Sequence, residues 1–203
     1  KASLRTEWRT SRVTSEDTHG AFGRSGVALP EPSRPATGDD AVDVLRGSAS
    51  ASTTLVTLGP LTNVANALAT DPLLLTRYEH TFLMAGSPDG IGNVNVAGEY
   101  NVWADPEAAP VVLAAPGAKT MVGWNISRQF AVITPADDAE LRSTGSLGTW
   151  ASEINVAVDD YCRRISGLDG YDLPDPATMA VALAPSLISN STQEAVVVGL
   201  DAP

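Results

Sequence analysis

Short apolar runs alternate with segments whose apolar residues recur at helical spacing. Runs that are rich in β-branched or apolar residues and bounded by glycine, proline or polar residues are typical of buried parallel strands. Apolar residues three or four positions apart predict amphipathic helices instead. The predicted strands are residues 53–58, 81–84, 119–123 and 195–198, and predicted helices include 39–46, 63–69 and 148–166. This alternation predicts an α/β fold with a mostly parallel sheet and helices on both faces.

Three further positions predict where helices begin. Thr62 is expected to be the N-cap of the helix 63–69. Asp105 is expected to cap a helix that has Pro106 at its first position. Thr134, followed by proline and two aspartates, predicts another helix start. Pro110 falls inside the second of these helices, where we expect it to delete one intrahelical hydrogen bond.

The stretch from Met84 to Ala109 contains the densest group of candidate binding residues. It leaves a predicted strand, passes through a glycine-punctuated loop, and carries Asn93, Asn95, Glu99 and Asn101 within nine positions. Loops that follow strands at the edge of an α/β sheet commonly hold ligands. Amides and a carboxylate suit a polyhydroxylated ligand, because each hydroxyl both donates and accepts. The alternative is an ordinary loop, since Asn, Asp and Gly also form turns.

Charge and composition exclude several classes of partner. The 203 residues carry a net charge of −11, and after residue 46 there are 17 acidic against 6 basic side chains. Such a surface repels phosphate backbones, so we expect no nucleic-acid partner. The only cysteine, Cys162, forms neither an internal disulfide nor a zinc site. No apolar run is long enough for a membrane span, so we expect no membrane partner.

Three motifs occur together in a specific order. They are a GPLTN turn within Leu58–Ala65, a Gly-Asn pair at 92–93, and EYNVWADPEAA at Glu99–Ala109. This combination resembles the inosine-uridine preferring nucleoside hydrolase family. The resemblance implies a Rossmann-like nucleoside hydrolase fold and hydrolysis of the N-ribosidic bond of ribonucleosides with a calcium-bound water. It also implies a nucleoside as the small-molecule partner, a place in purine or pyrimidine nucleoside salvage, and a homodimer or homotetramer.

The same resemblance assigns a ribose site. Asn93, Glu99 and Asn101 match the positions that hold the sugar, and Met84 matches the residue that lies against it. His19, in a His-Gly pair similar to a turn of the family, is a further ligand-facing candidate. A histidine beside glycine is also common in turns and on surfaces, so both interpretations of His19 stay open.

Two residues match calcium ligands of the family, which uses Ca²⁺ as its cofactor. The main-chain carbonyl of Thr62 is one, and the side chain of Asp175, in a late motif of the HDP type, is the other. Carboxylate and carbonyl oxygens are the ligands that calcium prefers. The alternative for both residues is helix capping, Asp175 for a helix beginning at Pro176. Capping by the Thr62 side chain is compatible with a metal at its carbonyl.

The chain departs from the family pattern in two places. Pro174 stands where the family often has a histidine that protonates the leaving base, and proline has no proton to give. The N-terminal DxDxxxDD motif, which supplies calcium ligands and the general base, has no counterpart, and Asp39-Asp40 lacks its spacing. We therefore expect the general base upstream of Lys1 and assign no catalytic residue. Residues 1–203 are interpreted as one domain that is incomplete at both ends.

Three functional hypotheses follow from these observations. The first is a nucleoside hydrolase, expected in the cytoplasm, with a secretion signal before Lys1 left open. The second is a non-catalytic nucleoside- or ribose-binding protein that lacks the full metal site. The third is a structural subunit that completes its site with a partner chain. The sequence does not indicate a preference for purine or pyrimidine bases.

Overall fold

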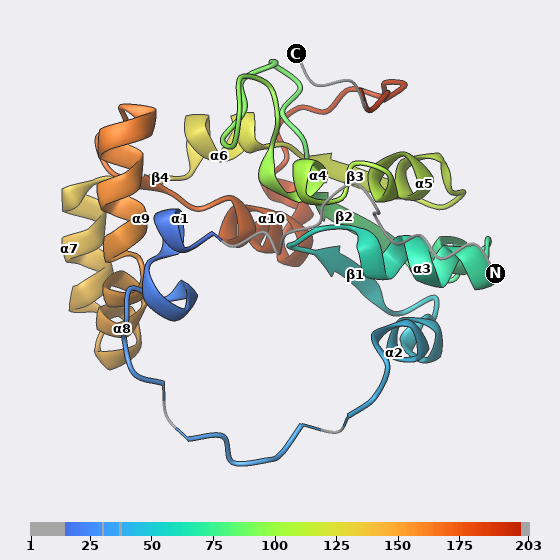
Figure 1. Ribbon diagram of the computed structural model, residues 1–203, viewed down its shortest axis with the longest axis horizontal. Helices are drawn as coiled ribbons and strands as arrows, with labels where there is room; N and C mark the ends of the chain where they lie inside the picture. The colour runs from blue at the N-terminus through green and yellow to red at the C-terminus, as the bar shows by residue number, and fades with distance from the viewer. Residues whose placement is uncertain (1–14, 30, 37, 200–203) are drawn as a thin grey trace. The chain divides into compact units, whose positions relative to one another are not determined.

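The computed structural model describes residues 15–29, 31–36 and 38–199 (Figure 1). These residues form two compact units. Unit 1 contains residues 38–126 and 174–199, and unit 2 contains described residues up to 36 together with residues 127–173. The single-domain interpretation of the whole chain stays a prediction.

A three-stranded parallel sheet is the centre of unit 1. Its strands are β1 (Thr54–Thr57), β2 (His80–Met84) and β3 (Lys119–Val122), in the order β1-β2-β3. Thr54 pairs with His80, and Thr81 pairs with Lys119. The first three predicted strands are thereby confirmed. Because the strands are parallel, their carboxyl ends all lie at the same edge of the sheet.

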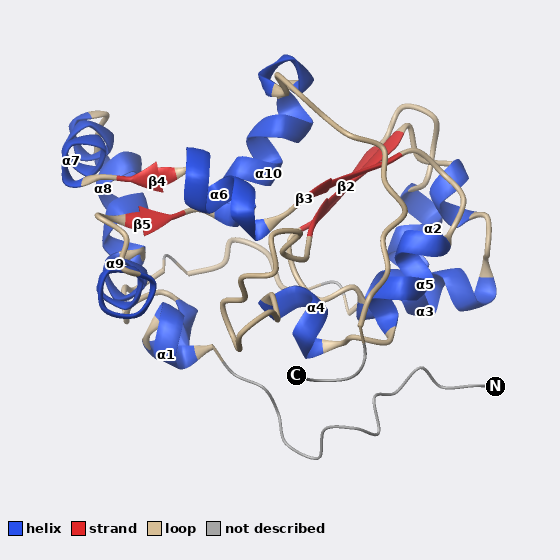
Figure 2. Cartoon of the chain, turned by 90° about the horizontal axis from the view of Figure 1, so that it is seen from above, coloured by secondary structure: helices blue, strands red, loops and turns tan. Residues whose placement is uncertain are grey.

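Helices cover both faces of this sheet. On one face, α3 (Thr62–Thr70) and α5 (Ala108–Ala114) pack together, and Leu83 of β2 belongs to the same buried cluster. Successive strand residues point to opposite faces, so Phe82 and Met84 face the other side. There α10 (Pro174–Leu183) packs against β1 and β2. Figure 2 shows α10 on the opposite side of the strands from α3 and α5. The predicted fold class, an α/β fold with a mostly parallel sheet, is confirmed.

Two predicted helix starts in unit 1 are shifted. The helix α3 begins at Thr62 itself, with Leu61 in the N-cap position, so the prediction that Thr62 caps this helix is wrong. The helix α5 begins only at Ala108, so Asp105 is not its N-cap either. Pro110 is then the third residue of α5, where the backbone has no intrahelical acceptor in any case. It therefore removes no hydrogen bond.

Several elements of unit 1 were not predicted or differ from the prediction. The short helix α4 (Tyr100–Ala104) was missed. The predicted strand 195–198 is wrong, because these residues have no regular structure and Val197 is exposed. The predicted helix near residue 39 is α2 (Ala41–Ser48), which begins after Asp40; the Asp40 carboxylate accepts the Val42 N–H at 2.8 Å. Short 3-10 helices cover Leu74–Thr76 and Pro185–Leu187.

Unit 2 is mainly helical. Its elements are α1 (Glu16–His19), a 3-10 turn (Ala21–Gly23), α7 (Pro135–Ser143), α8 (Ser146–Ile154), α9 (Val156–Tyr161) and a π-helical turn (Cys162–Ser166). Two short strands, β4 (Val132–Ile133) and β5 (Tyr171–Asp172), pair antiparallel. Helix α6 (Trp124–Phe130) spans the point in the sequence where the two units meet.

The capping prediction at Thr134 is confirmed. Its hydroxyl lies 2.7 Å from the Asp137 carboxylate, and the two residues form a reciprocal capping box at the start of α7. The single predicted helix 148–166 is wrong, because the segment is divided among α8, α9 and the π-helical turn. The break between α8 and α9 is at Asn155, whose side-chain amide donates to the Ala151 carbonyl at 2.8 Å. Among the described residues no helix is both long and apolar enough to cross a membrane.

Candidate functional site

The loop after β2 is closed by its own backbone. The Gly92 N–H donates to the Val96 carbonyl at 2.9 Å, and the Asn93 N–H donates to the Gly98 carbonyl at 3.1 Å. A Cβ atom at position 92 would lie 2.3 Å from the Asn95 carbonyl oxygen, so only glycine fits. The Asn95 side chain accepts the Gly98 N–H at 2.6 Å and therefore shapes the loop from within.

Glu99 is the buried end of this loop, with only 2% of its surface exposed. Its carboxylate accepts three backbone N–H groups, from Gly86 and Asn101 at 2.8 Å and from Val102 at 3.2 Å. Burial raises the pKa of Glu99, and the three N–H donors oppose that rise. A carboxylate has about four acceptor positions, so one remains for a ligand.

The residues predicted to hold a sugar form one hydrogen-bonded network. The Asn101 side-chain amide donates to the carbonyl and the sulfur of Met84, at 3.1 Å in both cases. Its own Oδ1 oxygen takes no part in these two bonds. The Asn93 side chain accepts the N–H of Tyr100, which is the residue between Glu99 and Asn101. The structure thus brings Met84, Asn93, Glu99 and Asn101 together at the carboxyl end of β2.

Asp175 adds a second carboxyl group to this neighbourhood. It is the second residue of α10, which begins at Pro174, so the alternative of Asp175 as an N-cap before Pro176 is wrong. Burial raises the pKa of Asp175 to about 6, and the negative charge of Glu99 contributes to that rise. Two carboxyl groups that repel each other in a partly buried place are stabilised by a cation.

The described residues supply only part of a complete metal site. Among them no group of three or more His, Cys, Asp or Glu side chains is arranged to hold a metal ion. Asp175 and the Thr62 main-chain carbonyl offer the hard oxygen atoms that calcium prefers, and their roles as metal ligands stay predictions. The side chain of Thr62 has another task, because its hydroxyl donates to Asp105 Oδ2.

Asp105 lies near the candidate site, and the sequence did not predict the hydrogen bonds of its side chain. It follows the last residue of α4 and is buried. While Oδ2 accepts from Thr62, Oδ1 accepts the Ala108 N–H at 3.2 Å. The sequence marked Asp105 only as a helix cap, and no local pattern indicates a partner 43 positions away.

His19 lies in unit 2, whereas the loop residues lie in unit 1. It is the exposed last residue of α1, and its carbonyl accepts the Ser25 N–H at 2.9 Å. The following Gly20 has φ +68°, and a Cβ there would lie 3.0 Å from the Ala157 Cβ, which explains the glycine of the His-Gly pair. The ligand-facing role of His19 stays a prediction.

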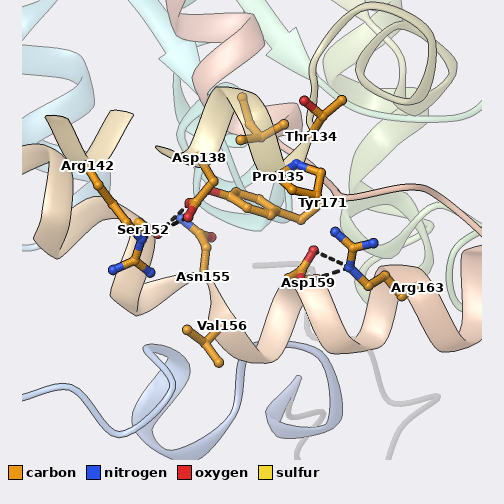
Figure 3. Close-up of a pocket in the computed structure, with 11 residues that line it drawn as sticks. Thr134, Pro135, Asp138, Arg142, Ser152, Asn155, Val156, Asp159, Arg163 and Tyr171 are labelled. Atoms are coloured by element: carbon orange, nitrogen blue, oxygen red, sulfur yellow. Dashed lines mark hydrogen bonds and ion pairs between the residues drawn. The ribbon is translucent and has the colours of Figure 1, made fainter. Parts of the chain in front are cut away.

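A pocket of about 210 Å³ lies in unit 2, and none of the predicted site residues lines it (Figure 3). Its central carboxylate, Asp138, accepts hydrogen bonds from Tyr171 at 2.8 Å, from Arg142 at 2.9 Å and from Ser152. A second pair, Asp159 and Arg163, is also bonded at 2.9 Å. Because these groups bind one another, the pocket is a structural network and not the candidate site.

Comparison with known proteins gives one family and several relatives. The family described as inosine-uridine preferring nucleoside hydrolase matches residues 3–202. A relative in Shewanella woodyi, named pyrimidine-specific ribonucleoside hydrolase RihA, is 34% identical over 182 residues. That match covers 87% of this chain and 58% of the relative, so the chain spans little more than half of the relative's length.

Solved structures give the same result. A plant nucleoside hydrolase, the PpNRh1 enzyme, matches with a TM-score of 0.84 at 32% identity, over 92% of this chain and 59% of that one. A purine-preferring ribonucleoside hydrolase from Gardnerella vaginalis matches with a TM-score of 0.79 at 28% identity, over 86% and 56%. The names of these relatives include both pyrimidine and purine specificities, so they indicate no base preference for this chain.

Proposed function

The chain belongs to the inosine-uridine preferring nucleoside hydrolase family, and on this basis we propose that its protein hydrolyses ribonucleosides to ribose and free base. The network of Met84, Glu99 and Asn101 carries the proposal. In it, backbone groups hold the Glu99 carboxylate and the Asn101 side chain near the end of β2, which supports a sugar site there. A sugar presents several neighbouring hydroxyls that donate to such acceptors.

The roles of the individual residues follow from their remaining hydrogen-bonding capacity. Glu99 has one acceptor position left after binding three N–H groups, and we assign it to a ribose hydroxyl. Asn101 uses its amide on Met84 and offers Oδ1 to a second hydroxyl. Because both side chains are held by backbone groups, the sugar meets acceptors that need no reorganisation on binding.

We propose calcium as the metal of the site, with Thr62 and Asp175 supplying a carbonyl and a carboxylate oxygen. The mutual repulsion of Asp175 and Glu99 supports a cation there. When bound, the ion supplies an oriented and more acidic water for hydrolysis. We assign no general base and no further metal ligand to the residues of this chain.

Departure of the base has no assigned proton donor in this chain. Pro174, the residue before Asp175, occupies the first position of α10 and has no titratable group. We therefore propose that the base leaves with a donor other than residue 174. The cytoplasmic location and the homodimer or homotetramer also remain proposals.

The test is hydrolysis by the full-length protein, measured as release of reducing sugar from a panel of purine and pyrimidine ribonucleosides. Turnover with calcium that disappears with a chelator is the expected result. Calorimetric titration of ribose in the same two conditions separates the alternatives. Ribose binding without turnover of any ribonucleoside would instead support the non-catalytic binding protein, and activity only after mixing with another polypeptide would support the structural subunit.

A further inference from the structure

Asp105 connects the beginnings of two helices. Its Oδ2 oxygen accepts the hydroxyl of Thr62, the first residue of α3, and its Oδ1 oxygen accepts the N–H of Ala108, the first residue of α5. The residue is only 4% exposed. A buried carboxylate is costly unless hydrogen bonds satisfy it, so these contacts hold the side chain in one position.

Asp105 also stands at one end of α4, and Glu99 stands at the other. Glu99 caps the N-terminus of α4 through the N–H groups of Asn101 and Val102, and Asp105 follows its last residue. The five-residue helix therefore joins a sugar-binding candidate to the residue that holds Thr62.

We propose that Asp105 is a positioning residue, which fixes the first turn of α3 and with it the Thr62 main-chain carbonyl that would bind the metal. The inference rests on the proposed function, because that function gives the carbonyl its role. Without the Asp105 bond, the Thr62 hydroxyl loses the side-chain partner that it has among the described residues, and we expect the turn after β1 to gain freedom. Residues that orient metal ligands through hydrogen bonds change metal affinity by about 10- to 100-fold when mutated.

The experiment removes the bond from each side in the full-length protein. Thr62→Val keeps the main-chain carbonyl and the side-chain shape but deletes the hydroxyl, and Asp105→Ala deletes the acceptor. We expect each variant to bind calcium about tenfold more weakly by calorimetry. Because both substitutions delete the same Thr62–Asp105 bond, the double variant is expected to lose no more calcium affinity than Asp105→Ala alone.

Two matched variants control for general damage. Thr62→Ser keeps the hydroxyl and is expected to retain calcium affinity. Thr134→Val removes an equivalent threonine-to-aspartate bond at the start of α7, in unit 2, and is expected to leave calcium affinity unchanged. Kinetics give a further readout: saturating calcium is expected to restore kcat in Thr62→Val, because the defect lies in metal affinity.

The outcomes separate this inference from the proposed function. Unchanged calcium affinity in Thr62→Val, or an equal loss in Thr134→Val, would overturn the positioning role. A wild-type protein that hydrolyses ribonucleosides without binding calcium would overturn it as well, while the hydrolase activity stands. Calcium binding that depends on the Thr62 hydroxyl in a protein without hydrolase activity would support the inference and refute the proposed function.

Discussion

Replacing Glu99 with glutamine tests the importance of its charge to the loop. One carboxylate oxygen binds the N–H groups of Gly86 and Val102, and the other binds that of Asn101. Glutamine has a single acceptor oxygen, so its best orientation keeps the first two bonds. Its NH₂ group then faces the Asn101 N–H, which is left without an acceptor.

The magnitude follows from these three bonds. A hydrogen bond to a charged group contributes about 1.5–3 kcal/mol, and the two that remain become neutral bonds of about 1 kcal/mol each. Relief of the cost of burying a charge offsets this weakening, because burial outweighs the three donors and raises the pKa of Glu99. What remains is the Asn101 N–H without an acceptor, which costs about 1–3 kcal/mol. We therefore expect Glu99→Gln to lower the free energy of unfolding by about 2 kcal/mol, which corresponds to a fall in Tm of about 4–8 °C for a protein of this size.

Urea unfolding followed by circular dichroism measures the change. Glu140→Gln, at an exposed position in α7, is the control and is expected to stay within about 0.5 kcal/mol of wild type. If Glu99→Gln is as stable as this control, the backbone donors do not require a charged acceptor, and the reasoning about Glu99 is wrong.

Two further predictions concern the loop and the buried thiol. Gly92→Ala places a Cβ against the Asn95 carbonyl, so we expect it to abolish ribose binding in a calorimetric titration, whereas Gly47→Ala, with open space around its Cβ, is expected to bind as wild type does. Burial raises the pKa of Cys162 from 9.0 to about 12, so the thiol stays protonated in the folded state while the unfolded chain releases its proton above pH 9. This contribution to stability is therefore complete below pH 9 and is lost as the pH rises toward 12, with a slope of about 1.4 kcal/mol per pH unit. Urea unfolding at pH 8 and pH 10 should show a steeper loss in wild type than in Cys162→Ser, and equal slopes would contradict the prediction.

The sheet and several helices could be predicted because their signals are local. The strands β1, β2 and β3 are short apolar runs with turn residues at both ends, and the cap of α7 is a contiguous motif. The helix α4 was missed because its cap is Glu99, a residue type that rarely caps helices. The strand predicted at 195–198 failed because a run of valines forms a strand only beside a partner, and the described residues give it none.

In the candidate site, too, local patterns could be predicted and contacts between distant residues could not. Glu99 and Asn101 could be predicted as site residues because they stand two positions apart in the motif EYNVWADPEAA. The bond between Thr62 and Asp105 could not, since it joins residues far apart in sequence and depends on how α3 and α5 pack. Local preference at Asp105 indicated a helix cap, and tertiary packing gave its side chain a second partner.

The parallel pairing of β1, β2 and β3 has a kinetic consequence. Thr54 must find His80, and Thr81 must find Lys119, so every contact between neighbouring strands closes a long stretch of intervening chain. Such non-local contacts lower the rate of folding, because the entropy of loop closure is lost before the contact forms. At the end of β2, the Gly86 N–H donates to the Glu99 carboxylate and the Met84 carbonyl accepts from the Asn101 amide, so both contacts depend on that pairing. A newly made chain therefore acquires the geometry of the candidate site late, when the sheet is already assembled.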